Sequence, residues 1–289
     1  MKNGLNVEST VSATTLHLPP YCRLINLVRL PAASGRGIYN EATIYHDNAS
    51  CRVSWHSSAV DCRLTHGSMV ALKGAPNLAL SDKVCLPIAR LELVDMPVAS
   101  INPFHTVPPS WVADRRLVRQ AAELWERVSR PLQHLINAVF WDGGRFHRFL
   151  TGPTSTAKDV FHPGGNFRHC VETAERAANL AKGLDGVSLP LMIASAFLSD
   201  AGKADDFRVS PEGYCLSERG AKVGYQNTIL EWLAVARPKV IMPEQLYLSL
   251  VHALVAGRRS GSGDSSIEAM ILSVARQVGE RSRELAQPS

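Results

Sequence analysis

A proline-rich segment at residues 95–110 divides the chain into two parts with different hydrophobic patterns. The segment contains four prolines and has no helical period, and proline interrupts both helices and the middle of sheets. Apolar residues come in short β-type runs before the segment and at helical spacing after it. We therefore predict an α+β chain with two domains, joined by a linker at residues 96–110.

The part before the linker has the pattern of a small antiparallel barrel. Residues 1–12 are polar and unpatterned, and we expect a flexible lead-in there. Between residues 13 and 95, five β-rich runs alternate with short turn sequences. They cover residues 21–30, 38–46, 50–55, 68–72 and 84–94. An OB fold has a suitable size, and a five-stranded SH3-like barrel is the alternative, because the number of strands does not fix their topology.

The part after the linker, residues 111–289, is predicted to be helical. Apolar residues from Val118 to Val139 recur at spacings of three and four, which indicates an amphipathic helix that starts near Pro109. Pro131 is expected to kink this helix or to divide it in two. Further helices are expected at residues 166–182, 189–198, 217–236, 243–256 and 265–285.

The last predicted helix carries an apolar stripe that bears on the position of Arg276. The stripe consists of Ile267, Met270, Ile271, Val274 and Val278. Arg276 lies nearly opposite this stripe on a helical wheel. Because the apolar side of a surface helix normally faces the core, Arg276 taken alone is expected to be solvated.

Composition limits the class of protein. The 289 residues are 45% apolar and 20% charged, so the chain can bury a core, and no apolar run is long enough to cross a membrane. With no secretory signal, we expect a cytoplasmic protein. The net charge is +5, and 23 of the 31 basic residues are Arg, which favours a nucleic-acid partner. The six cysteines form no C-x-x-C pair, and we expect reduced thiols.

Four segments in the helical part resemble the HD-domain phosphohydrolases. They are Phe149-Leu-Thr-Gly-Pro153, Phe161-His-Pro-Gly-Gly-Asn-Phe-Arg-His169, Leu198-Ser-Asp-Ala-Gly-Lys203 and Ser217-Glu-Arg-Gly220. Together with the barrel-like first third, they make the chain similar to YhaM-type 3′-to-5′ exoribonucleases, bacterial enzymes that join an OB fold to an HD domain. A similar histidine and Pro-Gly-Gly sequence occurs in HD domains of conjugative relaxases. The resemblance covers roughly residues 150–280 and implies an HD-type helical domain.

The resemblance also implies a divalent metal site, from which this chain departs at most ligands. In the family, imidazoles and carboxylates hold an ion that activates water for phosphoester hydrolysis. His169 matches the first ligand and Asp200 the aspartate of the His-Asp pair, but Ser199 stands where the histidine of that pair is expected. The later ligands align with Tyr225, Arg258 and Arg276. His169 and Asp200 remain residual metal candidates, and we expect no metal and no hydrolysis.

The cationic replacements suggest a phosphate-binding pocket instead. Its candidates, beside His169, are His162, Lys203, Arg258, Arg259 and Arg276. Purely structural roles are an equal alternative for these residues. In that interpretation Lys203 caps a helix, Arg258 and Arg259 are exposed in a Gly-Ser loop, and His169 is an ordinary histidine within a helix.

The barrel offers its own candidates for nucleic-acid binding. OB folds bind single strands by stacking bases on aromatic rings in a basic groove. The candidates are Arg23, Arg36, Tyr39, Tyr45 and Arg52. We place Tyr39 and Tyr45 on opposite faces of their strand, so that one of them at most lines the groove, and we expect Trp55 to be packed.

These observations favour a protein that binds single-stranded RNA or DNA without metal-dependent hydrolysis. The first alternative is an active phosphohydrolase or 3′-to-5′ exonuclease, with catalytic His169, Asp200 and Lys203 and a Mn or Mg ion held by His162, His169, Asp200 and His252. The second alternative is a protein-interaction adaptor in plasmid or mobile-element mobilisation.

Overall fold

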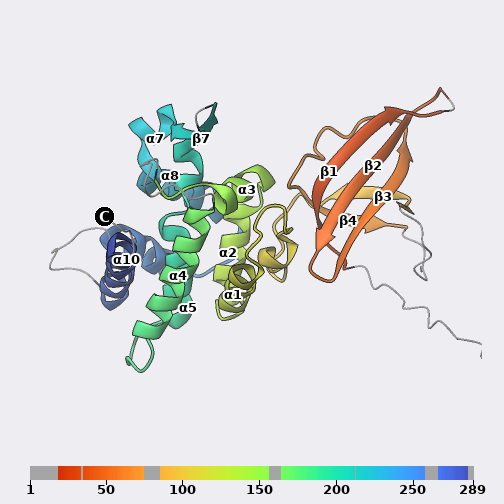
Figure 1. Cartoon of the computed structure of the whole chain (residues 1–289). Helices are drawn as coiled ribbons and strands as arrows, with labels where there is room; N and C mark the ends of the chain where they lie inside the picture. Colours follow the sequence, from red (N-terminus) through yellow and green to blue (C-terminus); the bar gives the residue numbers. More distant parts are fainter. Residues whose placement is uncertain are drawn as a thin grey trace, which may run out of the picture.

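The structure, a computed structural model, is a curled six-stranded sheet followed by a helical region (Figure 1). It describes residues 19–33, 35–74, 85–155, 164–211, 213–257 and 266–285. The mixture of α and β structure, with the strands first, confirms the coarse fold prediction. Among these residues, no helix combines the length and the apolar composition that a membrane crossing requires.

The sheet is formed by six strands in the order β5-β3-β2-β1-β4-β6. The strands are β1 (Cys22–Pro31), β2 (Ile38–His46), β3 (Ala49–Ser57), β4 (Met69–Lys73), β5 (Leu86–Pro87) and β6 (Arg90–Leu93). The run predicted at residues 84–94 is divided: β5 pairs parallel with β3, and β6 pairs antiparallel with β4. Because these consecutive strands occupy the two edges, the sheet curls to bring its edges towards each other. Trp55 is packed inside the curl, as predicted.

The helical region contains ten α-helices among the described residues, together with one short hairpin. The helices are α1 (Arg115–Glu126), α2 (Arg130–Phe140), α3 (Gly143–Thr151), α4 (Gly165–Leu180), α5 (Leu189–Ser199), α6 (Lys203–Asp206), α7 (Glu218–Lys222), α8 (Gly224–Ala236), α9 (Glu244–Ala256) and α10 (Ile267–Leu285). The hairpin joins β7 (Phe207–Ser210) and β8 (Gly213–Leu216).

Most helix predictions are confirmed, with three corrections. Pro131 divides the long amphipathic segment into α1 and α2, as expected, but α1 starts at Arg115, where the Asp114 side chain accepts from the amide of Leu117 at 3.1 Å. The helix predicted at residues 217–236 is broken at Gly224, whose φ of 72° is left-handed. Neither α3 nor the β7–β8 hairpin was predicted.

Helix α5 lies at the centre of the helical region. Every residue from Leu191 to Ser199 is buried, because α5 packs against α4, α9, α2 and α10. A helix that is apolar on all sides is buried in the core of a protein. Asp200, the C-cap of α5, is thus held inside the helical region.

The predicted linker is a packed part of the structure. Phe104, in a short 3-10 helix (Pro103–Thr106), is fully buried against the rings of Phe146, Phe167 and Phe197. The side-chain amide of Asn137 donates to the carbonyls of Val98, at 2.8 Å, and Ile101, at 2.7 Å. Residues 96–110 therefore attach the sheet to the helices.

The orientation of α10 overturns the expectation for Arg276. The inward face of α10 carries small and aliphatic residues, Ala269, Leu272, Ala275 and Gly279. Arg276 lies on this side with only 12% of its side chain exposed. The apolar stripe faces outward, except for Ile271. The assumption that the larger apolar side faces the core was wrong, because small residues allow α10 to approach α4 closely.

Candidate functional site

The polar cluster around Asp200 lies where two of the sequence motifs meet. The chain leaves α5 at Ser199 and turns through Asp200-Ala201-Gly202 into α6. A Cβ atom at position 202 would overlap the carbonyl oxygen of Tyr225. The glycine of the Asp-Ala-Gly-Lys motif thus permits the start of α8 to lie directly against the turn. This contact brings Tyr225 to Lys203 and Arg276, two of the partners of Asp200.

Both oxygens of the Asp200 carboxylate are occupied by nitrogen donors. Arg276 Nη2 lies 3.1 Å from Oδ1, while His169 Nε2 lies 2.8 Å and Lys203 Nζ 3.4 Å from Oδ2. Four sequence segments supply these groups and Tyr225: α4, the α5–α6 turn, the start of α8, and α10. We call these five residues the Asp200 cluster.

Tyr225 fixes the two cations in place. Its hydroxyl lies 3.3 Å from Arg276 Nη2, and the Lys203 ammonium is 4.9 Å from the centre of its ring. The backbone amide of Tyr225 donates to Asp206 Oδ2 at 2.8 Å. The Lys203 and Arg276 side chains are only 15% and 12% exposed, and each forms an ion pair with the fully buried Asp200, which compensates their charges.

The pKa values support an ionised cluster. Burial by itself raises the pKa of Asp200, but Lys203, the hydrogen bond with His169, and Arg276 together hold it well below its ordinary 3.8. Burial opposes the charge of Arg276, yet Asp200 and Tyr225 raise its pKa above the ordinary value of an arginine. The carboxylate and the guanidinium therefore both stay charged at neutral pH.

The cluster does not fit a divalent metal ion. An ionised carboxylate offers about four lone-pair positions, and at Asp200 three neighbouring groups, two of them permanent cations, already contact both oxygens. His169 Nε2 must carry its proton to donate to Asp200, so this nitrogen is not a ligand either. Arg276 and Lys203 would also repel a cation. Within the described ranges, no group of three or more His, Cys, Asp or Glu residues is arranged to hold a metal.

Several predicted site residues are not part of this cluster. His162, Arg258 and Arg259 lie outside the described residues. His252 lines a separate pocket of about 250 Å³ between α9 and the start of α10, and its Nε2 accepts from the amide of Ser266 at 3.4 Å. The four-ligand metal site of the hydrolase alternative is thus not assembled from the described candidates.

The outer face of the curled sheet is a second candidate site. Tyr39 lies beside Leu30 on β1 and His56 on β3, and the Tyr39 and His56 rings are 5.3 Å apart. Leu30 and His56 are exposed. Arg52 projects from the same face of β3 and pairs with Glu41. We call Leu30, Tyr39 and His56 the sheet platform.

Tyr39 and Tyr45 share a face, contrary to expectation. They are six positions apart on a strand without a bulge, and alternation returns the same face at every even separation. Both tyrosines are half-buried, but Tyr39 lies beside the exposed Leu30 and His56, whereas Tyr45 contacts Arg115 of α1. Arg36 is exposed in the turn between β1 and β2, beyond the open end of this face.

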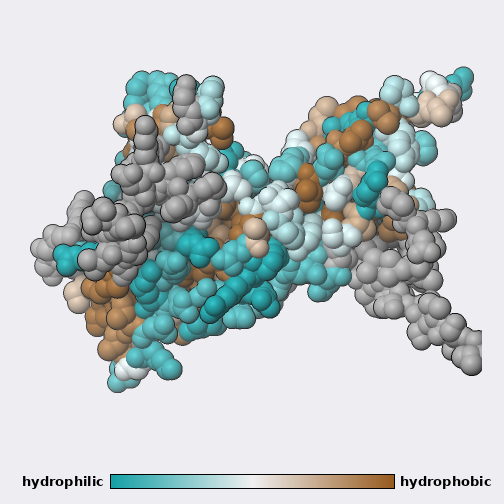
Figure 2. Space-filling view, viewed as in Figure 1, coloured by the Kyte–Doolittle hydropathy of each residue, from teal (hydrophilic) through white to brown (hydrophobic). Residues whose placement is uncertain are grey.

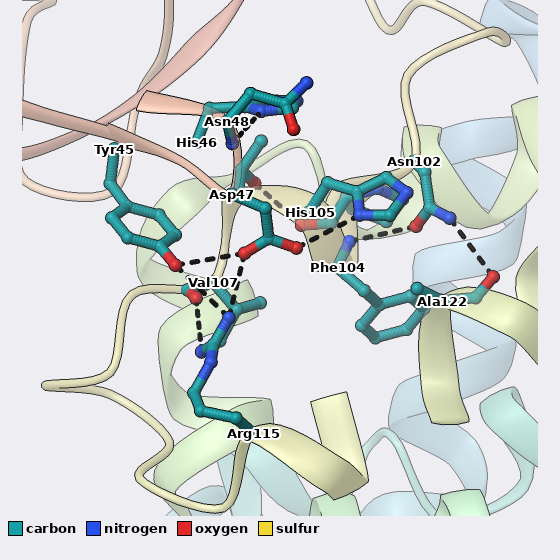
Figure 3. Close-up of polar contacts among 12 residues, drawn as sticks. Tyr45, His46, Asp47, Asn48, Asn102, Phe104, His105, Val107, Arg115 and Ala122 are labelled. Carbon is teal, nitrogen blue, oxygen red and sulfur yellow. Dashed lines mark hydrogen bonds and ion pairs between the residues drawn. The ribbon is translucent and has the colours of Figure 1, made fainter. Parts of the chain in front are cut away.

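The covered end of the sheet is held by polar contacts with the helical region (Figure 3). Asp47 Oδ1 accepts from the Tyr45 hydroxyl at 3.0 Å and from Arg115 Nη2 at 2.9 Å, while Oδ2 lies 3.1 Å from His105 Nδ1. The Tyr45 hydroxyl is therefore engaged in the contact between the sheet and the helical region, and Tyr45 does not line an open groove.

Arg23 is also removed from the predicted groove. Its guanidinium donates to the Thr106 hydroxyl and, at 2.9 Å, to the carbonyl of Gly67, and it lies 4.7 Å from the ring of Phe146. Burial lowers the pKa of Arg23 to about 9, so it stays protonated at neutral pH. A buried guanidinium has no surface on which to meet a nucleic acid, and this prediction is corrected.

Sequence reasoning missed His56 and the junction residues Asp47, His105 and Arg115. Alternation along β3 could have found His56, since it stands two positions after Ser54 and opposite Tyr39. No sequence signal links Asp47 with Arg115, which are 68 positions apart.

No family model, curated protein or solved structure matches the chain.

Proposed function

We propose that this protein binds single-stranded nucleic acid on the sheet platform and does not hydrolyse it through a metal ion. The observation that carries the non-hydrolytic part of the proposal is the Asp200 carboxylate, both oxygens of which are paired with His169, Lys203 and Arg276. In this proposal the helical region is a degenerate HD-type domain in the cytoplasm.

Convergence of the aligned positions supports the HD interpretation. His169, Asp200, Tyr225 and Arg276 align with family metal ligands in four separate segments, and they form one chain of contacts from His169 through Asp200 and Arg276 to Tyr225. In place of an ion that neutralises a carboxylate, the chain has a guanidinium and an ammonium. This exchange keeps the charge balance of such a site and removes the means to activate water.

The sheet topology supports an OB-type barrel. When β5 and β6 are regarded as one interrupted strand, five strands form a ring in which this strand bridges β3 and β4. OB barrels bind oligonucleotides on the face of their second and third strands. Tyr39 on β2 and His56 on β3 lie on that face, where π-faces stack bases of any sequence.

Binding is tested by fluorescence anisotropy with labelled single-stranded RNA and DNA over a range of salt concentrations. The proposal predicts an affinity that falls steeply as salt rises. Tyr39→Ala and His56→Ala should each weaken binding about 5- to 150-fold, the range that corresponds to loss of one stacked base. Tyr214→Ala, on the β7–β8 hairpin, is the matched control and should bind normally.

The same reactions with added manganese test hydrolysis. Bound strands of unchanged length support the proposal. Trimming from the 3′ end that Asp200→Asn abolishes would contradict it and favour the exonuclease. No binding to either strand would also contradict it and favour the adaptor.

A further inference from the structure

The outward face of α10 is an apolar surface without a partner in the described part of the chain. Ile267, Met270, Val274 and Val278 are 51, 53, 47 and 47% exposed. They lie at intervals of three or four residues and form one continuous stripe along the helix. Figure 2 shows hydrophobic atoms gathered on the side of the helical region where α10 lies. Scattered surface apolar residues are ordinary, but an aligned stripe is typical of a docking surface.

We propose that this stripe docks against the same stripe of a second copy, with the two α10 helices antiparallel. The stripe is symmetric about Val274. Met270 and Val278 lie four residues on either side, and Ile267 and Arg281 lie seven residues on either side. A two-fold axis at Val274 therefore places Met270 against Val278 of the partner copy, and Ile267 against Arg281.

Charge decides between antiparallel and parallel pairing. In the antiparallel pair, the aliphatic stem of Arg281 covers Ile267 of the partner copy, and its guanidinium lies near Glu268. A parallel pair would place Arg281 against Arg281. Like charges across the axis are unfavourable, and antiparallel helices also oppose their dipoles favourably.

The size of the stripe predicts a weak dimer. From Ile267 to Val278 the helix rises about 17 Å, so the face buries less than the roughly 800 Å² per partner of a standard interface. Leu248, 50% exposed, adjoins the start of α10 in the pocket that contains Glu268 and extends the apolar surface. We therefore expect association that depends on protein concentration.

Sedimentation of the full chain from about 10 to about 200 μM tests the association. The average mass should rise from that of one 31.5 kDa chain towards twice this value. Val274→Glu should keep the protein monomeric throughout. Val235→Glu, at an exposed position on α8, is the matched control and should behave as the wild type. A wild type that stays monomeric, or a dimer that survives Val274→Glu, would overturn the proposal.

Disulfide cross-linking tests the antiparallel register. Cys62 is exposed, so the variants carry Cys62→Ser. Val274→Cys should cross-link to itself because position 274 lies on the axis. Met270→Cys alone should not, since its two copies are about 12 Å apart along the helices. A mixture of Met270→Cys and Val278→Cys chains should cross-link. Equal self-cross-linking at 270 and 274, or none at 274, would refute this register.

Discussion

Replacement of Asp200 by Asn removes the charge that compensates Arg276 and Lys203 without changing the volume of the side chain. Both cations are more than four-fifths buried, and breaking a buried ion pair from one side costs about 3–5 kcal/mol. For a helical region of this size, each kcal/mol lowers the melting temperature by about 2–4 °C. We therefore expect Asp200→Asn to melt about 6–20 °C below the wild type, as measured by circular dichroism.

The control is Glu218→Gln, which breaks the exposed Glu218–Lys222 pair. An exposed helical pair of this kind contributes no more than about 0.5 kcal/mol, so this variant should melt almost as the wild type does. A second variant, Asp200→Asn with Arg276→Met, should recover part of the loss, because removing both charges leaves fewer unpaired ions. The account is refuted if Asp200→Asn is no worse than Glu218→Gln, or if the double variant recovers nothing.

The difference in stability between the wild type and Asp200→Asn should depend on pH, because the pKa of Asp200 is lowered in the folded chain. In the unfolded chain the carboxyl group has a pKa near 3.9, and in the folded chain the pKa is lower. Its contribution to stability is therefore complete above about pH 5 and is lost as the pH falls towards the folded value. The gap between wild type and Asp200→Asn should narrow in acid, and a gap that widens below pH 4 would contradict the assignment.

Three further predictions concern the attachment of the sheet to the helices. Gly143→Ala should lower the free energy of unfolding in urea by about 2 kcal/mol or more, because its Cβ atom would overlap the carbonyl of Gly67. Gly144→Ala is the control and should change the stability little, because only flexible side-chain atoms lie near its Cβ position. Equal losses of stability in the two variants would refute the close contact between Gly143 and Gly67. Phe104→Ala should cost about 3–5 kcal/mol, whereas the exposed Ser110→Ala should cost almost nothing; a mild Phe104→Ala would show that residues 96–110 are a loose linker. Burial lowers the pKa values of His66 and His147, whose rings contact each other and Trp111. Because these histidines bind protons more readily in the unfolded chain, the free energy of unfolding should fall from pH 7 to pH 5. The double variant His66→Phe with His147→Phe should show a smaller fall over the same pH range.

The approximate positions of most of the longer helices were predictable from local signals. Pro131 separates α1 from α2, and the apolar run that becomes α5 is identified by its composition alone. The first three strands also follow from their alternation and their turns. These features depend on residues close together in the sequence, which is why local patterns find them.

Features that depend on packing between distant segments were not predictable. The apolar stripe of α10 was expected to face the core, but it faces outward. The opposite face packs against α4, because its small residues allow the two helices to approach closely. The sequence predicted Arg23 as a surface residue, but its guanidinium is buried against Thr106 and Phe146. These partners lie far away in the sequence, so no local pattern indicates them. The error at Tyr39 and Tyr45 was different in kind, since strand alternation alone places them on one face.

The candidate site was partly predictable. The motif alignment identified His169, Asp200 and Lys203, and it noted Tyr225 and Arg276 where family ligands were expected. The helical wheel, however, predicted a solvated Arg276, which is wrong. The direct contact between Arg276 and Asp200 required α10 to turn its small residues inward, which only the three-dimensional packing shows.

The most direct test of the central claim is the manganese content of the purified protein, compared with that of Asp200→Asn. The protein would be produced with excess manganese, dialysed and analysed for metals. Because His169, Lys203 and Arg276 occupy the Asp200 carboxylate, we predict that neither protein retains metal at a stoichiometric level. One manganese ion per wild-type chain, absent from Asp200→Asn, would contradict the account.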